Sequence, residues 1–220
     1  MRWKRSASAA VVLAAALAAS ACGGGSAGGG GDKKPSGACS DVPFPKAKDQ
    51  AQLKAPTSTL DPAKTYKVVI ETNCGAFTIT LDQQTSPKTA ASFVSLAEDG
   101  YFDDTFFHRI APGFVIQGGD PTGKGTGGPG YTTIEAPPAG AAYVRYVVAM
   151  AKTSAQPPGA AGSQFFIVTA ADAQLPPEYA LLGKVTEGMS VVNRIGKLGD
   201  PTTQDPTRAV VIDTMTVEES

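Results

Sequence analysis

The chain has 220 residues, of which 42% are hydrophobic and 18% charged, enough for one sizeable core. After the first 21 residues it carries 16 basic and 20 acidic side chains, and this acidic excess argues against a protein that binds nucleic acid or an anionic membrane by charge. One histidine and three dispersed cysteines argue against a zinc site. The 25 glycines and 17 prolines favour a turn-rich, mostly β protein over a helical bundle.

Residues 1–21 have the pattern of a secretory signal peptide. Arg2, Lys4 and Arg5 precede the unbroken apolar run Ala9–Ala19. Its 11 residues are too few to span a bilayer as a helix, which takes about 20. Small residues follow at positions 19–21, as a cleavage site requires. We therefore expect the protein to be exported.

Cys22 follows this signal directly and begins a glycine-rich stretch, with seven glycines among residues 23–31. The segment Leu17–Cys22 resembles a bacterial lipoprotein signal, in which the cysteine becomes the lipid-modified N-terminus. Ala19 stands where such signals usually carry leucine, so ordinary cleavage and secretion stay open as an alternative. Because a glycine-rich stretch is typical of a flexible tether, we favour a lipid anchor on Cys22 at the outer face of the cell membrane.

The other two cysteines, Cys39 and Cys74, would lie in an oxidising compartment after export. We predict a disulfide between them, which would fix residues 39–60 to the domain. It would close a loop of 34 intervening residues and stabilise the fold by about 3–4 kcal/mol in the chain-entropy model. Two unpaired thiols are the alternative.

Residues 22–63 combine the glycine-rich tether with a proline-rich lead-in, and the folded domain is predicted over residues 64–220. The β-branched runs Tyr66–Thr72 and Ala76–Leu81 predict a hairpin. Ser86 and Pro87 then have the pattern of an N-cap and first residue of a helix, which is expected to run to about Asp99.

Short strands dominate the rest of the chain, with a second helix expected around Ser190–Ile195. The predicted strands are Phe106–Ile110, Phe114–Gln117, Val144–Ala149, Phe165–Thr169, Leu181–Val185 and Val210–Val217. Because they do not alternate with helices, the pattern predicts an antiparallel β-barrel capped by two helices.

The segment from Phe107 to Asp120 carries the densest chemical information. His108 and Arg109 are neighbours on a predicted strand, so their side chains point to opposite faces. The same alternation places Phe114 with Ile116 on one face, unless a bulge intervenes. Outside the glycine-rich residues 23–31 the chain has no Gly-x-Ser-x-Gly pattern, so no predicted strand leads into such a turn, which excludes the common α/β-hydrolase arrangement.

Five segments, in order along the chain, resemble the signature of the cyclophilins, the peptidyl-prolyl cis-trans isomerases. They are Phe107–Asp120, Gly125–Gly128, Met150–Ala151, Gly162–Ile167 and Leu182–Val185. The similarity covers about Lys67 to Val217. It implies an eight-stranded barrel with a helix at each end, proline-containing polypeptides as partners, and a monomer. It also implies a reaction without a metal or other cofactor, because X-Pro rotation needs only a proline pocket and a donor that prefers the twisted amide.

The resemblance also implies site roles. Arg109 would be the catalytic arginine, and Gln117 would bind the substrate backbone and orient Arg109. Ala151 and Lys152 would lie along the groove for the peptide backbone. The residues of the proline pocket and its rim would be Phe114, Val115, Phe166, Leu175 and Tyr179.

Two departures from the family pattern keep an alternative open. The segment 152–161 replaces the usual loop and is longer, and Gln174 stands where many members carry tryptophan. A non-catalytic proline-peptide-binding module, or a membrane-anchored chaperone, is therefore the alternative to an isomerase that assists the folding of exported proteins in the cell envelope.

Overall fold

A hairpin begins the folded domain where the β-branched runs predict it. The structure, a computed structural model, describes residues 37–220, so the predicted signal peptide and Cys22 lie outside the described residues. Strands β1 (Tyr66–Thr72) and β2 (Gly75–Leu81) pair antiparallel, with Val68 opposite Ile79. Both of these side chains are fully buried, as expected for the inward positions of an alternating strand.

The main sheet of the described chain has nine strands, in the order β3-β11-β1-β2-β10-β7-β9-β5-β4, and every neighbouring pair is antiparallel. The strands not yet given bounds are β3 (Thr105–Phe106), β4 (Arg109–Ala111), β5 (Val115–Gly118), β7 (Val147–Met150), β9 (Phe165–Val168), β10 (Leu181–Glu187) and β11 (Val211–Glu219). A separate two-stranded sheet joins β6 (Thr133–Ile134) to β8 (Ala160–Ala161).

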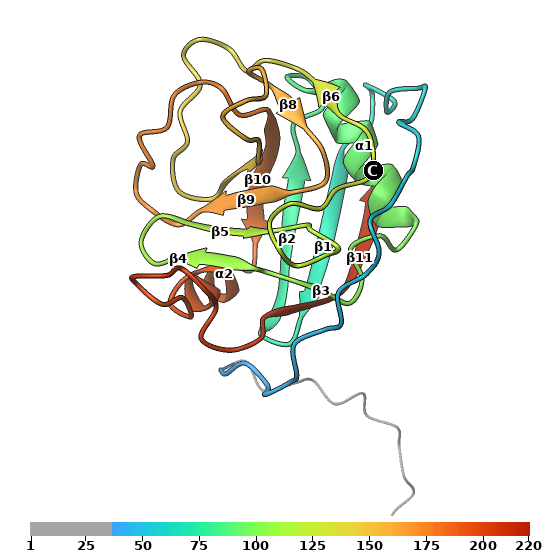
Figure 1. The fold of residues 1–220 in the computed structure, drawn as a ribbon. Coiled ribbons are helices and arrows are strands. Elements are labelled where there is room, and N and C mark those ends of the chain that lie inside the picture. The colour runs from blue at the N-terminus through green and yellow to red at the C-terminus, as the bar shows by residue number, and fades with distance from the viewer. Residues whose placement is uncertain (1–36) are drawn as a thin grey trace, which may run out of the picture. The chain divides into compact units, whose positions relative to one another are not determined.

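The two ends of the main sheet belong to one segment of chain. Strands β3 and β4 are interrupted only at Phe107 and His108, and they pair with β11 on one side and β5 on the other. Counted as one strand, they make an eight-stranded sheet that curls on itself (Figure 1). The predicted mostly β, antiparallel fold with two helices is confirmed.

The helices are α1 (Pro87–Glu98) and α2 (Met189–Ile195), close to their predicted bounds. Ser86 occupies the N-cap of α1 without a side-chain cap bond. The Glu135 carboxylate takes over this role, because it accepts hydrogen bonds from the backbone N–H groups of Lys88 (2.9 Å) and Thr89 (2.7 Å). Within residues 37–220, no helix has the length and apolar character needed to cross a membrane.

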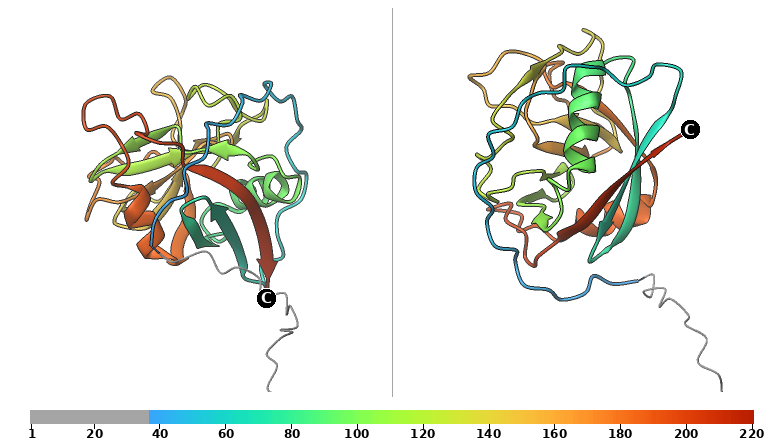
Figure 2. Two further views of the ribbon diagram at one scale, coloured as in Figure 1. Left: turned by 90° about the horizontal axis from the view of Figure 1, so that it is seen from below. Right: turned by 90° about the vertical axis from the view of Figure 1, so that its right-hand side faces the viewer.

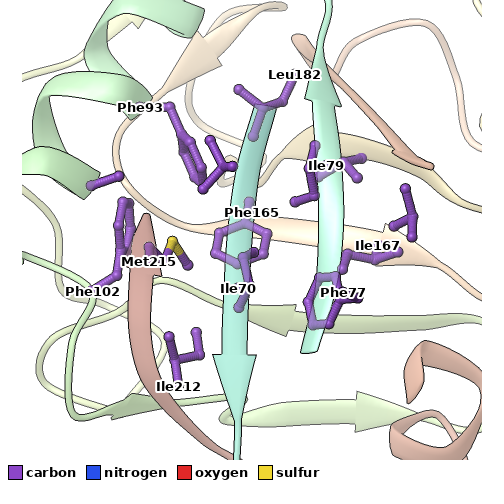
Figure 3. Close-up of a cluster of buried hydrophobic side chains, with 14 of the residues drawn as sticks. Ile70, Phe77, Ile79, Phe93, Phe102, Phe165, Ile167, Leu182, Ile212 and Met215 are labelled. Carbon is purple, nitrogen blue, oxygen red and sulfur yellow. The ribbon is translucent and has the colours of Figure 1, made fainter. Parts of the chain in front are cut away.

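The core fills the inside of the curled sheet. Figure 3 shows Ile70 and Ile79 of the first hairpin beside Phe165 and Ile167 of β9. Phe93 of α1 packs edge-on against Phe165, with ring centroids 5.4 Å apart. Because Phe165 and Ile167 point inward, the alternation of β9 turns Phe166 to the outer face of the sheet.

One predicted side-chain orientation is wrong. Phe114 does not share a face with Ile116, because it precedes β5 in the turn that Pro112 and Gly113 make after β4. Gly113 has φ of 73°, and the Phe114 N–H donates to the Ala111 carbonyl at 3.0 Å. This turn places the Phe114 ring against the outer cluster of apolar side chains, whereas Ile116 lies in the inner core.

Residues 37–63, here called the N-terminal arm, run along the domain before β1 (Figure 2). Cys39 forms a disulfide with Cys74, the pairing predicted from the sequence. Next to it, the Ser40 N–H donates to the Asn73 carbonyl at 2.9 Å. The arm therefore belongs to the same compact unit as the sheet.

Candidate active site

A row of side chains crosses the outer face of the sheet where β4, β5, β9 and β7 lie side by side. In the strand register Arg109 is opposite Gln117, Gln117 is opposite Phe166, and Phe166 is opposite Ala149. Residues directly opposite each other on antiparallel strands project from the same face. Pairing therefore brings these groups together, although they are up to 57 residues apart in the chain.

This row forms the floor of a pocket of about 200 Å³, here called the first pocket. It brings together all nine residues that the sequence predicts as catalytic or substrate-binding. They are Arg109, Phe114, Val115, Gln117, Ala151, Lys152, Phe166, Leu175 and Tyr179. The apolar side chains of this pocket can hold a compact ring, and the cationic and amide groups beside them can donate hydrogen bonds to it.

Aromatic contacts hold the rim of the first pocket in place. Phe166 and Tyr179 meet edge-to-face, with ring centroids 5.4 Å apart. Behind them Tyr143 is buried, and its hydroxyl donates to the Tyr179 carbonyl at 2.7 Å and accepts from the Tyr179 N–H at 2.9 Å. These two bonds fix the backbone of Tyr179 at the rim of the pocket.

Arg109 is held by two glutamine side chains. Its Nε donates to Gln204 Oε1 at 2.8 Å, and its Nη1 donates to Gln117 Oε1 at 3.3 Å. The guanidinium carbon lies 5.8 Å from the centre of the Phe114 ring. Burial lowers the pKa of Arg109, and an arginine side chain nevertheless stays protonated in proteins. No described residue accepts a hydrogen bond from Nη2, so these donors are available to a ligand.

The network continues from Gln117 into a neighbouring loop. Gln117 Nε2 donates to Gln164 Oε1 at 3.0 Å, and Gln164 Nε2 donates to the Gly127 carbonyl at 2.9 Å. Sequence reasoning missed Gln164 and Gln204 as site residues. Gln164 lies in the recognised segment 162–167 and could have been assigned from it, whereas Gln204 lies in a loop without a motif, 95 residues from Arg109.

Lys152 joins the site to the loop that departs from the family pattern. Its side chain is only 4% exposed and pairs with Glu178 at 3.0 Å. The ammonium group also lies 5.6 Å from the centre of the Tyr179 ring and donates to the Gln156 carbonyl at 3.3 Å. The charge of Lys152 is therefore compensated within the protein.

A second pocket, of about 420 Å³, adjoins the first. It is formed by residues 125–132, 151–153 and 162–164, with Gln50, Gln117 and Gln156. Gln117, Ala151 and Lys152 line both pockets. A ligand seated in the first pocket can therefore extend directly into the second.

Asp120 orders the glycine-rich wall of the second pocket. It is fully buried, and its carboxylate accepts hydrogen bonds from the N–H groups of Thr122 (2.7 Å), Lys124 (3.1 Å) and Gly127 (3.1 Å). Burial alone would raise the pKa of Asp120, but the hydrogen bonds from Gly127 and Thr122 hold it below its usual range. In the described part of the chain, no three His, Cys, Asp or Glu side chains gather as a metal site would need.

His108 comes directly before β4, and a Cβ at Gly125 of the glycine-rich loop would lie 3.8 Å from its ring. Neither ring nitrogen has a hydrogen-bond partner among the described residues. Burial lowers the pKa of His108 and so does the Arg109 charge, while Asp120 acts in the opposite direction. The folded protein therefore keeps this ring neutral at a pH where the unfolded chain would already protonate it.

We expect acid to destabilise the protein through His108. Because the pKa of His108 is lower in the folded state, the contribution of its neutral ring to the free energy of unfolding is fully present above the unfolded pKa of about 6.5. This contribution is lost as the pH falls below that value. In urea unfolding at a series of pH values below neutrality, the free energy of unfolding should fall as the pH falls. The steepest fall due to this one proton is about 1.4 kcal/mol per pH unit. The variant His108→Gln should flatten this slope. An equal slope in the variant would assign the acid sensitivity to other groups.

Comparison with known proteins places the same residues in a family context. Residues 67–217 match the family model described as "Cyclophilin type peptidyl-prolyl cis-trans isomerase/CLD". Peptidyl-prolyl cis-trans isomerase A of Mycobacterium tuberculosis is 36% identical over 177 residues, which cover 72% of this chain and 96% of that protein. Peptidyl-prolyl cis-trans isomerase CYP18-2 of Arabidopsis thaliana is 35% identical over 154 residues, which cover 66% of this chain and 90% of that protein.

Solved structures show the same likeness. A cyclophilin-type peptidyl-prolyl cis-trans isomerase of Cryptosporidium parvum superposes with a TM-score of 0.64 at 33% identity, and covers 70% of this chain and 98% of its own. The same Cryptosporidium protein has been crystallised in the presence of the dipeptide Ala-Pro, and this structure also has a TM-score of 0.64.

Proposed function

Because the chain belongs to the cyclophilin-type peptidyl-prolyl cis-trans isomerases, we propose that this enzyme isomerises X-Pro bonds of exported proteins and assists their folding at the cell envelope. The observation that carries the catalytic part is the first pocket, where Arg109 lies between Gln204 and Gln117 and shares the pocket with apolar side chains. A cation held in this way favours an enzyme over a non-catalytic peptide-binding module or a chaperone.

The geometry accounts for the acceleration in physical terms. Rotation about an X-Pro bond breaks amide resonance and faces a barrier of about 20 kcal/mol. As the amide twists, the prolyl nitrogen regains a lone pair that can accept a hydrogen bond. Phe114 and Phe166 would hold the pyrrolidine ring, and Arg109 Nη2 would donate to that nitrogen. A donor that bonds the twisted amide more strongly than the planar one lowers the barrier.

The remaining groups would bind and orient the substrate. Gln117 presents its amide at the edge of the pocket, where it can bond the peptide backbone, and its Oε1 fixes the Arg109 guanidinium. Arg109 would therefore enter the reaction already oriented, so that little reorganisation accompanies the twisting of the bond. Each step uses a hydrogen bond or an apolar contact of this chain's own side chains.

The signal-like residues 1–21, Cys22 and the following glycine-rich stretch support export and a lipid anchor. The disulfide between Cys39 and Cys74 is consistent with an oxidising compartment. Proline-containing segments of other exported proteins would then be the substrates, and the tether would let the domain reach them from the membrane.

We expect the chain, expressed in a bacterium fed with labelled fatty acid, to carry the label and to sediment with the membranes. The variant Cys22→Ser should lose the label and leave the membrane fraction. Unlabelled parent protein in the culture medium would support secretion without an anchor. Protein that stays in the cytosol with its first 21 residues intact would contradict export altogether.

A further inference from the structure

The N-terminal arm reaches the site, although it lies outside the segment that the family shares. The family model begins at residue 67. The Cryptosporidium structure aligns over 98% of its own length but covers only 70% of this chain. The Lys48 N–H donates to the Pro121 carbonyl at 2.9 Å, and the Leu53 N–H donates to the Pro129 carbonyl at 2.7 Å. These two bonds lay residues 48–53 along the outer edge of the loop that walls the second pocket.

Gly130 lets the arm approach this loop closely. It has φ of 91°, and a Cβ at this position would lie 2.9 Å from both the Ala51 carbonyl oxygen and Gln52 Cα. The loop and the arm therefore touch backbone to backbone, which only a residue without a side chain permits. This contact places Gln50 at a defined position above the pocket.

Gln50 completes the wall of the second pocket. Its Nε2 donates to the Gly128 carbonyl at 2.6 Å, a bond that orients the amide. Gln50 Oε1 has no hydrogen-bond partner among the described residues, and Gln50 itself lines the pocket. An oriented amide with an unused acceptor at a pocket wall is suited to bind a ligand that can donate a hydrogen bond.

The other groups of the second pocket are polar but carry no free charge. Lys152 is the only charged residue that lines it, and Glu178 compensates that charge at 3.0 Å. Thr126, Ser163 and Gln164 line the pocket together with glycine backbone. The Ser163 hydroxyl donates to the Gly119 carbonyl at 2.7 Å, and the Gln164 amide is bonded at both its oxygen and its nitrogen. Of these three side chains, Thr126 alone has no hydrogen-bond partner among the described residues. Such a lining bonds uncharged polar side chains well and offers no counter-ion to an acidic one.

We propose that Gln50 of the N-terminal arm is a specificity-determining residue, which selects substrates with an asparagine or glutamine close to the isomerised proline. This inference rests on the proposed function. A peptide whose proline ring occupies the first pocket passes Gln117, Ala151 and Lys152, and a neighbouring side chain then enters the second pocket. There the amide N–H of that side chain donates to Gln50 Oε1.

The test compares proline peptides that carry asparagine, glutamine, leucine or lysine at each position flanking the proline. The parent protein should prefer the amide peptides over the leucine peptides in kcat/KM. At the position that reaches the second pocket, Gln50→Ala should reduce this preference by about two- to tenfold, the range of one hydrogen bond, and mainly through KM. Gln52→Ala is the matched control, because Gln52 is also an exposed arm glutamine but does not line the pocket.

A gain of function provides a second test. Gln50→Glu would place an uncompensated negative charge in the second pocket, so it should raise kcat/KM for the lysine peptide relative to the leucine peptide. Unchanged ratios in both Gln50 variants would overturn the inference, and so would an equal loss for all peptides. A parent protein that binds the peptides without isomerising them would contradict the proposed function instead, and the same ratios would then be measured as dissociation constants.

Discussion

Arg109→Ala is expected to lower kcat/KM for isomerisation of an Ala-Pro peptide by about 100- to 1,000-fold, the range for removal of one oriented donor from a reaction site. The expectation rests on the position of Arg109, whose guanidinium is the only cation with an uncompensated charge and free N–H donors among the residues that line the first pocket. Lys152 also lines this pocket, but Glu178 holds its ammonium group at 3.0 Å. The loss should appear mainly in kcat, because the apolar walls still bind the proline ring.

Two further variants make this result specific. Arg109→Lys keeps the positive charge, but a lysine ammonium lacks the planar guanidinium whose separate nitrogens bond Gln204 and Gln117. Most of the activity should therefore still be lost. Arg145→Ala is the matched control, since Arg145 is exposed and lies outside both pockets. If folded Arg109→Ala keeps the activity of the parent, the catalytic role of this residue is wrong.

Loss of the disulfide is expected to have the largest effect on stability. Cys39→Ser removes a cross-link between residues 35 positions apart in sequence, which should lower the free energy of unfolding by about 3–4 kcal/mol in the chain-entropy model. The main-chain bond from Ser40 to Asn73 and the bond from Asn73 Nδ2 to the Ser40 carbonyl (2.8 Å) remain, so the arm should stay attached in the folded state.

Urea unfolding of the parent protein and the variant, each with and without reductant, measures this effect. Reductant should bring the parent to the stability of Cys39→Ser and should leave the variant unchanged. Isomerase activity of the folded variant should be preserved, because the first pocket is built on β4, β5, β7 and β9, away from the turn that holds Cys74. A parent protein whose stability does not respond to reductant would show that the bridge contributes nothing.

Local patterns were enough to predict most of the elements. The β-branched run Tyr66–Thr72 is β1, and the helix predicted from Ser86 and Pro87 is α1. Predictions from alternation were wrong where a turn intervened. Tyr146 has φ of 72°, so β7 begins at Val147 and not at Val144, and the Gly113 turn moves Phe114 to the outer face. Such departures depend on the fit of a loop against the rest of the fold, which periodicity does not encode.

The sequence by itself determined the family and the nine residues of the first pocket, because the recognised segments carry them in a fixed order and Arg109 and Gln117 face each other across one short hairpin. Only the tertiary structure decided which groups hold and extend this site. Gln204 reaches Arg109 across 95 residues, and Gln50 reaches Gly128 across 78. Neither contact follows from a local pattern, since each forms only when the closed sheet brings a loop or the arm against a surface made elsewhere in the chain.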